Sequence, residues 1–299
     1  MTAICFPSFG LGMSALALVS ERKAYTTIEL ALKSGIRYFD TAALHGDGQA
    51  EVWLGHALRN TPEDVIVSTK CGWYRDFGNP PPFQSGQADI WDFSEKKTRL
   101  SVDLLSERLN QSFLDIVFLH DTKENIYQAF FEALPVSREL QANNRIGMIG
   151  VRCNTVDALL TSLEAGITDV LLIAERWTLL DRTVGLELLL LANSRNTNII
   201  VGEVLNSGCL AQHDNASAKF NYRPISRIEQ CKFRELCTLI NKYTSLMAVA
   251  LQFPNRDPCV SVTLLGVSEA DQLRGSFRFL DQVIPDMFWQ EVEGMGLKA

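Results

Sequence analysis

Apolar residues follow two alternating patterns along the chain. Short uninterrupted runs rich in β-branched residues are typical of strands buried on both faces of a parallel sheet. Longer stretches with apolar residues three and four positions apart indicate amphipathic helices. Eight strands are predicted, at Ser8–Gly12, Ile36–Asp40, Val65–Thr69, Asp115–Leu119, Gly147–Val151, Asp169–Ile173, Asn198–Gly202 and Ser261–Leu265. Eight helices are predicted between and after them, at Tyr25–Ser34, Glu51–Asn60, Ser94–Asn110, Ile126–Asn143, Val156–Ala165, Thr183–Ser194, Ile228–Tyr243 and Asp271–Leu280.

Eight strand-then-helix units predict an α/β fold, a single (β/α)8 TIM barrel that forms one domain over residues 1–299. A doubly wound open sheet is the structural alternative. That fold would be expected to carry G-x-G-x-x-G after its first strand, and the sequence has no such motif. The longest irregular stretch, Cys71–Phe93, follows the third strand. It is therefore expected on the carboxyl-end face of the barrel, where TIM-barrel sites lie.

Composition and charge narrow the class of protein. Hydrophobic residues make up 46% of the chain and charged residues 21%, with a net charge of −7, which is typical of a globular protein. The acidic balance and the lack of a long basic run argue against a nucleic-acid partner. No segment has the length and apolarity expected of a membrane span. Seven scattered cysteines without a C-x-x-C motif indicate reduced thiols, and therefore a cytoplasmic protein.

Polar side chains end three consecutive predicted strands or directly follow them. Asp40, Lys70 and His120 occupy these positions. In a parallel barrel these strand ends are neighbours, so a lysine, a carboxylate and an imidazole are expected to meet there. Each charge biases the protonation of the others, which suits proton transfer. An ordinary ion pair beside a strand-capping histidine is the structural alternative.

Several motifs, in the same order along nearly the whole chain, resemble the aldo-keto reductase family, and most of all its sugar (fucose, arabinose or galactose) and pyridoxal dehydrogenase branch. The matching segments are Arg37–Ala42, Val67–Lys70, Asp115–Asp121, Ile149–Val151, Thr178–Asp181, Asn206–Leu210, Ala250–Pro254 and Leu265–Gly266. The resemblance implies an oxidoreductase that transfers hydride between NAD or NADP and a small carbonyl or hydroxyl compound, sugar-like or another metabolite.

The resemblance also implies roles for the strand-end residues. The family's tetrad consists of Asp, Tyr, Lys and His, so Asp40, Lys70 and His120 would fill three of its positions. The tyrosine position, five residues after the aspartate, holds His45. Beside Lys70 an imidazole is expected to be neutral. A neutral imidazole is able to act as a base or a hydrogen-bond donor, but it is a poor acid for a developing alkoxide.

Positions that the resemblance assigns to the cofactor also depart from the family. Glu203 stands where the branch usually has glycine in the loop that receives the pyrophosphate, and its carboxylate would repel phosphate. Ser268 replaces the arginine that holds the adenosine 2′-phosphate, which would favour NAD over NADP. Together these departures weaken the case for any dinucleotide. The candidate cofactor-binding residues are Asn154, Trp177, Glu203, Leu205, Ser207, Gly266 and Ser268.

Aromatic residues of the long irregular stretch are the candidate substrate contacts: Trp73, Tyr74 and Trp91. Anchoring of the loop to the barrel is their equally weighted alternative. Other activities on the same barrel stay open. One is a cofactor-independent lyase, dehydratase or isomerase that uses His45, Lys70 and His120 for proton transfer. Another is a redox-inactive pseudoenzyme. A metal site built from the two histidines and Asp40 is disfavoured by the positive charge of Lys70.

Overall fold

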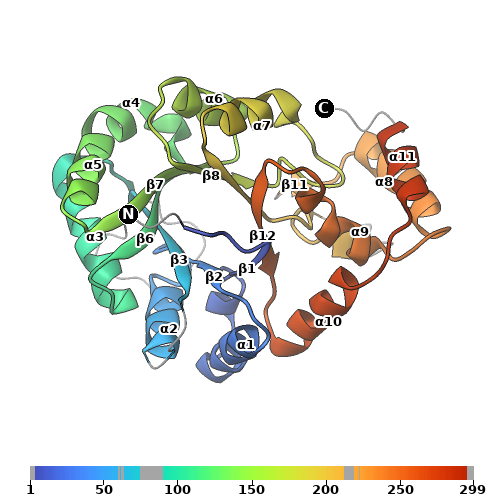
Figure 1. Cartoon of the computed structure of the whole chain (residues 1–299), viewed down its shortest axis with the longest axis horizontal. Helices are drawn as coiled ribbons and strands as arrows, with labels where there is room; N and C mark the ends of the chain where they lie inside the picture. Colours follow the sequence, from blue (N-terminus) through green and yellow to red (C-terminus); the bar gives the residue numbers. More distant parts are fainter. Residues whose placement is uncertain are drawn as a thin grey trace.

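Eight parallel strands close into a barrel in the computed structural model, which describes residues 4–59, 61, 64–74, 90–211, 219–221 and 223–294. Around the ring the strands are β1 (Phe9–Gly12), β2 (Tyr38–Asp40), β3 (Ile66–Cys71), β6 (Leu114–His120), β7 (Ile146–Cys153), β8 (Val170–Ala174), β9 (Asn198–Gly202) and β12 (Val260–Gly266). The strands lie at the centre and the helices surround them (Figure 1). The predicted (β/α)8 barrel is confirmed, and each predicted strand overlaps an observed one.

Helices cover the outside of the barrel in the predicted order. They are α1 (Glu21–Lys33), α2 (Gln49–Leu58), α3 (Glu95–Leu109), α4 (Ile126–Gln128), α5 (Leu134–Ala142), α6 (Val156–Glu164), α7 (Gly185–Ser194), α8 (Arg227–Ile240), α9 (Leu246–Gln252), α10 (Ala270–Leu280) and α11 (Asp286–Gly294). Among the described residues, short 3₁₀ turns lie at Leu16–Leu18, Thr122–Glu124, Cys209–Ala211 and Pro254–Arg256. Two small two-stranded sheets lie outside the barrel. One pairs β4 (Trp73–Tyr74) with β5 (Ile90–Trp91), and the other pairs β10 (Lys219–Phe220) with β11 (Arg223–Pro224). In the described part of the chain, no helix combines the length and apolarity needed to cross a bilayer.

The predicted helix Ile126–Asn143 is not one regular α-helix. A π-helical segment, Ala129–Ala133, separates α4 from α5. Pro135 lies in the first turn of α5, where its missing N–H and its ring disturb the regular hydrogen-bond ladder, and the wider π turn accommodates the change. The period of the apolar residues predicted the helix but not this irregularity.

Two layers of apolar side chains hold the barrel together. Tyr38, Phe118, Leu172 and other strand residues form a cluster inside the barrel. Alternate strand residues, such as Phe39, pack outward in a larger cluster with the helices. Strands filled on both faces explain the uninterrupted apolar runs, and they leave polar groups only at the strand ends. The opening at the carboxyl ends of the strands, called the mouth below, is therefore where chemistry is possible.

Close packing of α2 on α3 gives the first prediction. A Cβ at Gly55 would lie 2.6 Å from the carbonyl oxygens of Arg108 and Leu109. We expect Gly55→Ala to lower the free energy of unfolding by about 1–3 kcal/mol, the usual cost of overpacking. Gly275 in α10 is the matched control, because a Cβ at this position would lie 4.0 Å from the ring of Phe279. Gly275→Ala should stabilise by up to roughly 1 kcal/mol. Urea denaturation measures the free energy of unfolding of both variants. Equal changes in Gly55→Ala and Gly275→Ala would contradict the close contact at Gly55.

Candidate active site

A buried ion pair joins β2 to β3 at the mouth. Lys70 Nζ donates to Asp40 Oδ1 and Oδ2 at 2.9 and 2.8 Å and to the Thr41 carbonyl at 2.6 Å. Ser68 Oγ donates to Asp40 Oδ1 at 2.7 Å. Burial lowers the pKa of Lys70, while the charge of Asp40 opposes that shift. Since all three ammonium hydrogens have acceptors in the protein, Lys70 acts on a ligand through its charge.

Two histidines lie near this pair. His45 follows β2, and His120 ends β6 with 3% of its surface exposed. Burial, followed by the charges of Lys70 and Arg152, holds the pKa of His45 well below its usual value. Burial, Arg152 and Lys70, in that order, do the same for His120. Within the described residues, His45 Nδ1 is buried without a hydrogen-bond partner. Both imidazoles are therefore neutral near pH 7, and His45 has a ring nitrogen not engaged by the protein.

Arg152 is a residue of the mouth that was not predicted from the sequence. Its Nη1 donates to Asp121 Oδ1 at 2.7 Å, and its Nη2 donates to Glu203 Oε1 at 3.4 Å. Asp121 follows β6 and Glu203 follows β9, so the guanidinium of this β7 residue reaches across the mouth. A signal for it exists in the sequence. Met148, four residues earlier, packs against the interior cluster, and strand periodicity places position 152 on the same face.

Two glutamates directly follow β8 and β9. Glu175 and Glu203 both have left-handed backbone, with φ of 62° and 55°. Ser207 Oγ donates to Glu175 Oε1 at 2.5 Å. Among the described residues, the Oε2 atoms of both glutamates are buried and lack a partner. Burial raises the pKa of Glu175 to about 7, the hydrogen bond from Ser207 opposes the shift, and the charge of Glu203 adds to it. The predicted site included Glu203 but missed Glu175.

The other expected cofactor residues lie around the same rim. The Asn154 carbonyl accepts from Arg176 Nε at 2.9 Å. Trp177 is buried against Phe253, with ring centroids 5.8 Å apart. Within the part of the chain that the structure covers, its indole N–H is buried without an acceptor. Leu205 is half-buried, and its carbonyl closes the turn through the Gly208 and Leu210 amides.

Donors at the carboxyl end of β12 are already engaged. Gly266 ends the strand and pairs in register with Gly12 of β1. The Ser268 amide and hydroxyl both donate to Gln272 Oε1, at 2.8 and 3.1 Å. Gln272 therefore occupies the donors that Ser268 would offer to a bound anion.

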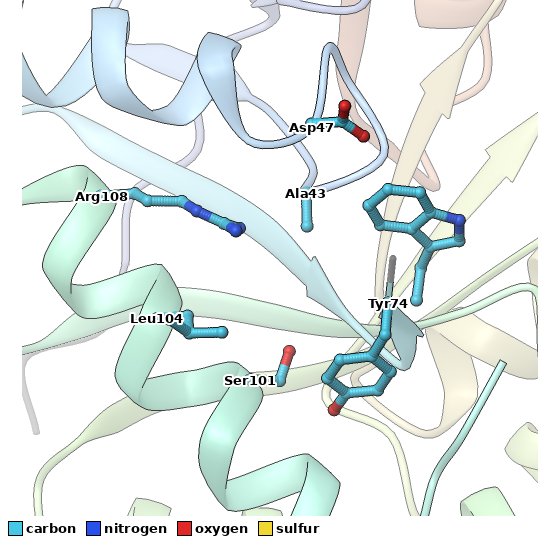
Figure 2. A pocket seen from close by; sticks show the side chains of 7 residues that line it. Ala43, Asp47, Tyr74, Ser101, Leu104 and Arg108 are labelled. Atoms are coloured by element: carbon cyan, nitrogen blue, oxygen red, sulfur yellow. The ribbon is translucent and has the colours of Figure 1, made fainter. Parts of the chain in front are cut away.

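A cavity lies beside the loop that carries His45. It encloses about 360 Å³, including space open to solvent. Ser101, Leu104 and Arg108 project from α3 towards Ala43 and Tyr74 (Figure 2). Its lining residues are Ala43, Asp47, Trp73, Tyr74, Ser101, Leu104 and Arg108.

The three aromatic residues that were expected to contact substrate lie in one small sheet, in which Trp73 of β4 is paired with Trp91 of β5. Trp73 and Tyr74 line the cavity, whereas Trp91 lies edge-on to His120, with ring centroids 5.2 Å apart. Residues 75–89 of the same loop lie outside the described residues. A shared substrate role for the three stays a prediction.

A metal site built from the histidines and Asp40 is not formed. Both Asp40 oxygens are bound by Lys70. Over the residues that the structure describes, no group of three or more His, Cys, Asp or Glu side chains is arranged to hold a metal ion.

A closed parallel barrel with titratable groups converging at its mouth has the architecture of a TIM-barrel enzyme. Residues 8–296 match the model of the aldo/keto reductase family. The chain belongs to this family, which confirms the resemblance predicted from its motifs, and it is an oxidoreductase of this type. Members of the family generally use NAD(P)H.

Named relatives agree with this assignment. The chain is 31% identical to a pyridoxal 4-dehydrogenase of Microbacterium luteolum, covering 99% of this chain and 96% of the relative. It is 29% identical to a D-threo-aldose 1-dehydrogenase of a Pseudomonas species, covering 97% and 94%. The aldo-keto reductase AKR11C1 of Bacillus halodurans shares the fold, with a TM-score of 0.83 at 22% identity over 98% of this chain and 93% of that one.

Acidic side chains at the mouth disfavour the phosphate end of a dinucleotide. Following the family resemblance, the pyrophosphate would lie at the loop after β9, where the unpartnered oxygens of Glu203 and Glu175 are acceptors and repel an anion. The hydroxyl of Ser207 is donated to Glu175. Arg152 and Arg176, the arginines near these glutamates, are paired with Asp121 and Asp181.

The raised pKa of Glu175 gives a pH-dependent prediction. An ordinary glutamate titrates near 4.5, whereas Glu175 in the folded protein titrates at about 7. Between these values the native state holds a proton that the unfolded chain releases, so this group makes stability fall as pH rises. We expect Glu175→Gln to raise the free energy of unfolding at pH 8 by on the order of 1–3 kcal/mol more than at pH 4.5.

Urea denaturation at the two pH values measures this effect. Glu132→Gln, at an exposed position of the π segment, is the control and should change little at either pH. Equal effects of Glu175→Gln at both pH values would contradict the raised pKa.

Proposed function

We propose that the mouth interconverts a hydroxyl and a carbonyl group on a small sugar-like compound or related metabolite, with His45 in the position of the family's catalytic tyrosine. The named relatives act on pyridoxal and on aldoses, which supports this class of substrate. NAD or NADP is the hydride acceptor that the family supplies, and the serine at 268 favours NAD. The chain's own residues support the proton-transfer half of this reaction.

A neutral His45 beside a buried cation carries the proposal. Alcohol oxidation needs a base that takes the hydroxyl proton, and a neutral imidazole is able to serve at pH 7. The charges of Lys70 and Arg152 favour negative charge on the substrate oxygen. They also disfavour the imidazolium, so the proton must be passed on rather than stored. His120, also neutral, would hydrogen-bond the same oxygen. These features favour the oxidative direction.

A second candidate is a cofactor-independent lyase, dehydratase or isomerase on the same barrel. The observation that favours it is the pair of carboxyl groups, Glu175 and Glu203, at the expected pyrophosphate position. The same histidines and Lys70 would then move a proton on a carbon next to a carbonyl.

The test of His45 uses pyridoxal and L-galactose as substrates, with NAD or NADP, followed at 340 nm. We expect His45→Ala to lower kcat/KM by roughly 10²–10⁴-fold, the usual contribution of a general base. His56→Ala is the matched control, because His56 is exposed on α2 and hydrogen-bonded to Tyr25. Turnover that His45→Ala leaves unchanged would contradict the proposal.

Calorimetric titration with NADH and NADPH separates the two candidates. The first predicts that NADH binds, and more tightly than NADPH because Ser268 replaces arginine. Binding should tighten in Glu203→Gly, since the substitution removes the carboxylate. No binding of either dinucleotide at millimolar concentration, in the wild type or the variant, would leave the second candidate.

A further inference from the structure

We propose that Arg152 binds the carboxylate of a small hydroxy or keto acid, and that the side chain of Glu203 takes this place on the guanidinium when no substrate is bound. The inference deepens the proposed function, because it names the group by which a substrate of the same site is held. It applies to either candidate activity.

Among the described cations that act on the two histidines, geometry favours Arg152 over Lys70 as the one that would bind a ligand. All three hydrogens of Lys70 are donated within the protein. Arg152 is only 11% exposed at its side chain, yet its charge acts on both His45 and His120. A planar guanidinium matches a carboxylate with two parallel hydrogen bonds. A carboxylate held there would place a hydroxyl on the adjacent carbon beside the two neutral imidazoles.

Two carboxylates that accept hydrogen bonds from Arg152 differ in the length of those bonds. Asp121 accepts at 2.7 Å, whereas Glu203 accepts at 3.4 Å. The Glu203 side chain is 32% exposed, and its second oxygen is buried without a partner among the described residues. Its backbone is left-handed, a conformation that costs a non-glycine residue about 1 kcal/mol or more and is often found at functional sites. Glu203 is therefore the exchangeable partner, and Asp121 the one that fixes the guanidinium.

The surrounding charges set the limit on this binding. Lys70 is neutralised by Asp40, and Arg176 is paired with Asp181. Glu175 is the remaining acid near Arg152, and its pKa of about 7 leaves it partly protonated at neutral pH. With Glu203 turned to solvent, a bound carboxylate replaces one negative charge by another, so the charge balance at Arg152 is preserved.

The experiment uses glycolate, the smallest hydroxy acid, as the probe and ethylene glycol as its uncharged counterpart. Saturation-transfer NMR detects binding to the full-length protein at millimolar concentrations and needs no turnover. We expect glycolate but not ethylene glycol to bind. Glu203→Gln removes the internal competitor and should tighten glycolate binding by about fivefold or more. Arg152→Met should weaken it by roughly tenfold or more, the loss expected for a charge-assisted hydrogen bond.

Arg176→Met is the matched control, because it removes an arginine of the same rim that is paired with Asp181. The charge of Arg176 is not one of those that lower the pKa values of His45 and His120. Glycolate affinity should change less than about twofold in this variant. Equal binding of ethylene glycol, no glycolate binding to the wild type, or weaker binding to Glu203→Gln would overturn the inference. If Arg152→Met does not fold, Glu203→Gln still decides. These outcomes leave the His45 turnover test untouched, so the two proposals fail separately.

Discussion

A lysine buried at the mouth of the barrel is the constraint on which the site depends. Removing an ammonium group from water is costly, and the cost is acceptable only because Asp40 and the Thr41 carbonyl accept all of its hydrogens. This arrangement fixes β2 against β3 and leaves a positive charge close to His45 and His120. Together with burial and Arg152, that charge keeps both imidazoles neutral. The protonation states of the two histidines thus follow first from burial and then from the charges of Lys70 and Arg152.

Fold and ion pair could both be predicted from the sequence, because strong and local physical signals encode them. Strands covered on both faces must be apolar throughout, so the few polar residues at their ends stand out. Eight strand-then-helix units predict that the carboxyl ends of neighbouring strands meet, and the Asp40–Lys70 pair and the nearby histidines lie at those ends. The short helices α9 and α11 were missed because neither has a long enough apolar period. The π segment before Pro135 was missed because it keeps the period of a helix.

The hydrogen bonds that Arg152 makes across the mouth could not be predicted in the same way. Arg152 directly follows the predicted strand Gly147–Val151, as Lys70 and His120 follow theirs, so its position was a usable signal that was not taken up. Glu175 follows an apolar strand without a motif, and only the structure brings it close to Glu203. The expectation that Glu203 would repel a phosphate stays a prediction. Its pairing with Arg152 required the three-dimensional arrangement of β6, β7 and β9.

We propose that His45 is a neutral imidazole at the position where the resemblance to the family implies a tyrosine. ¹⁵N-resolved NMR of the histidine rings through pH 4.5–8 tests it most directly, with His45→Gln identifying the signals. The account predicts that His45 stays neutral well below its usual pKa of 6.5, while exposed His56 serves as an internal comparison. Protonation of His45 at or above pH 6.5 would contradict the account, because an imidazolium could not accept the substrate's proton.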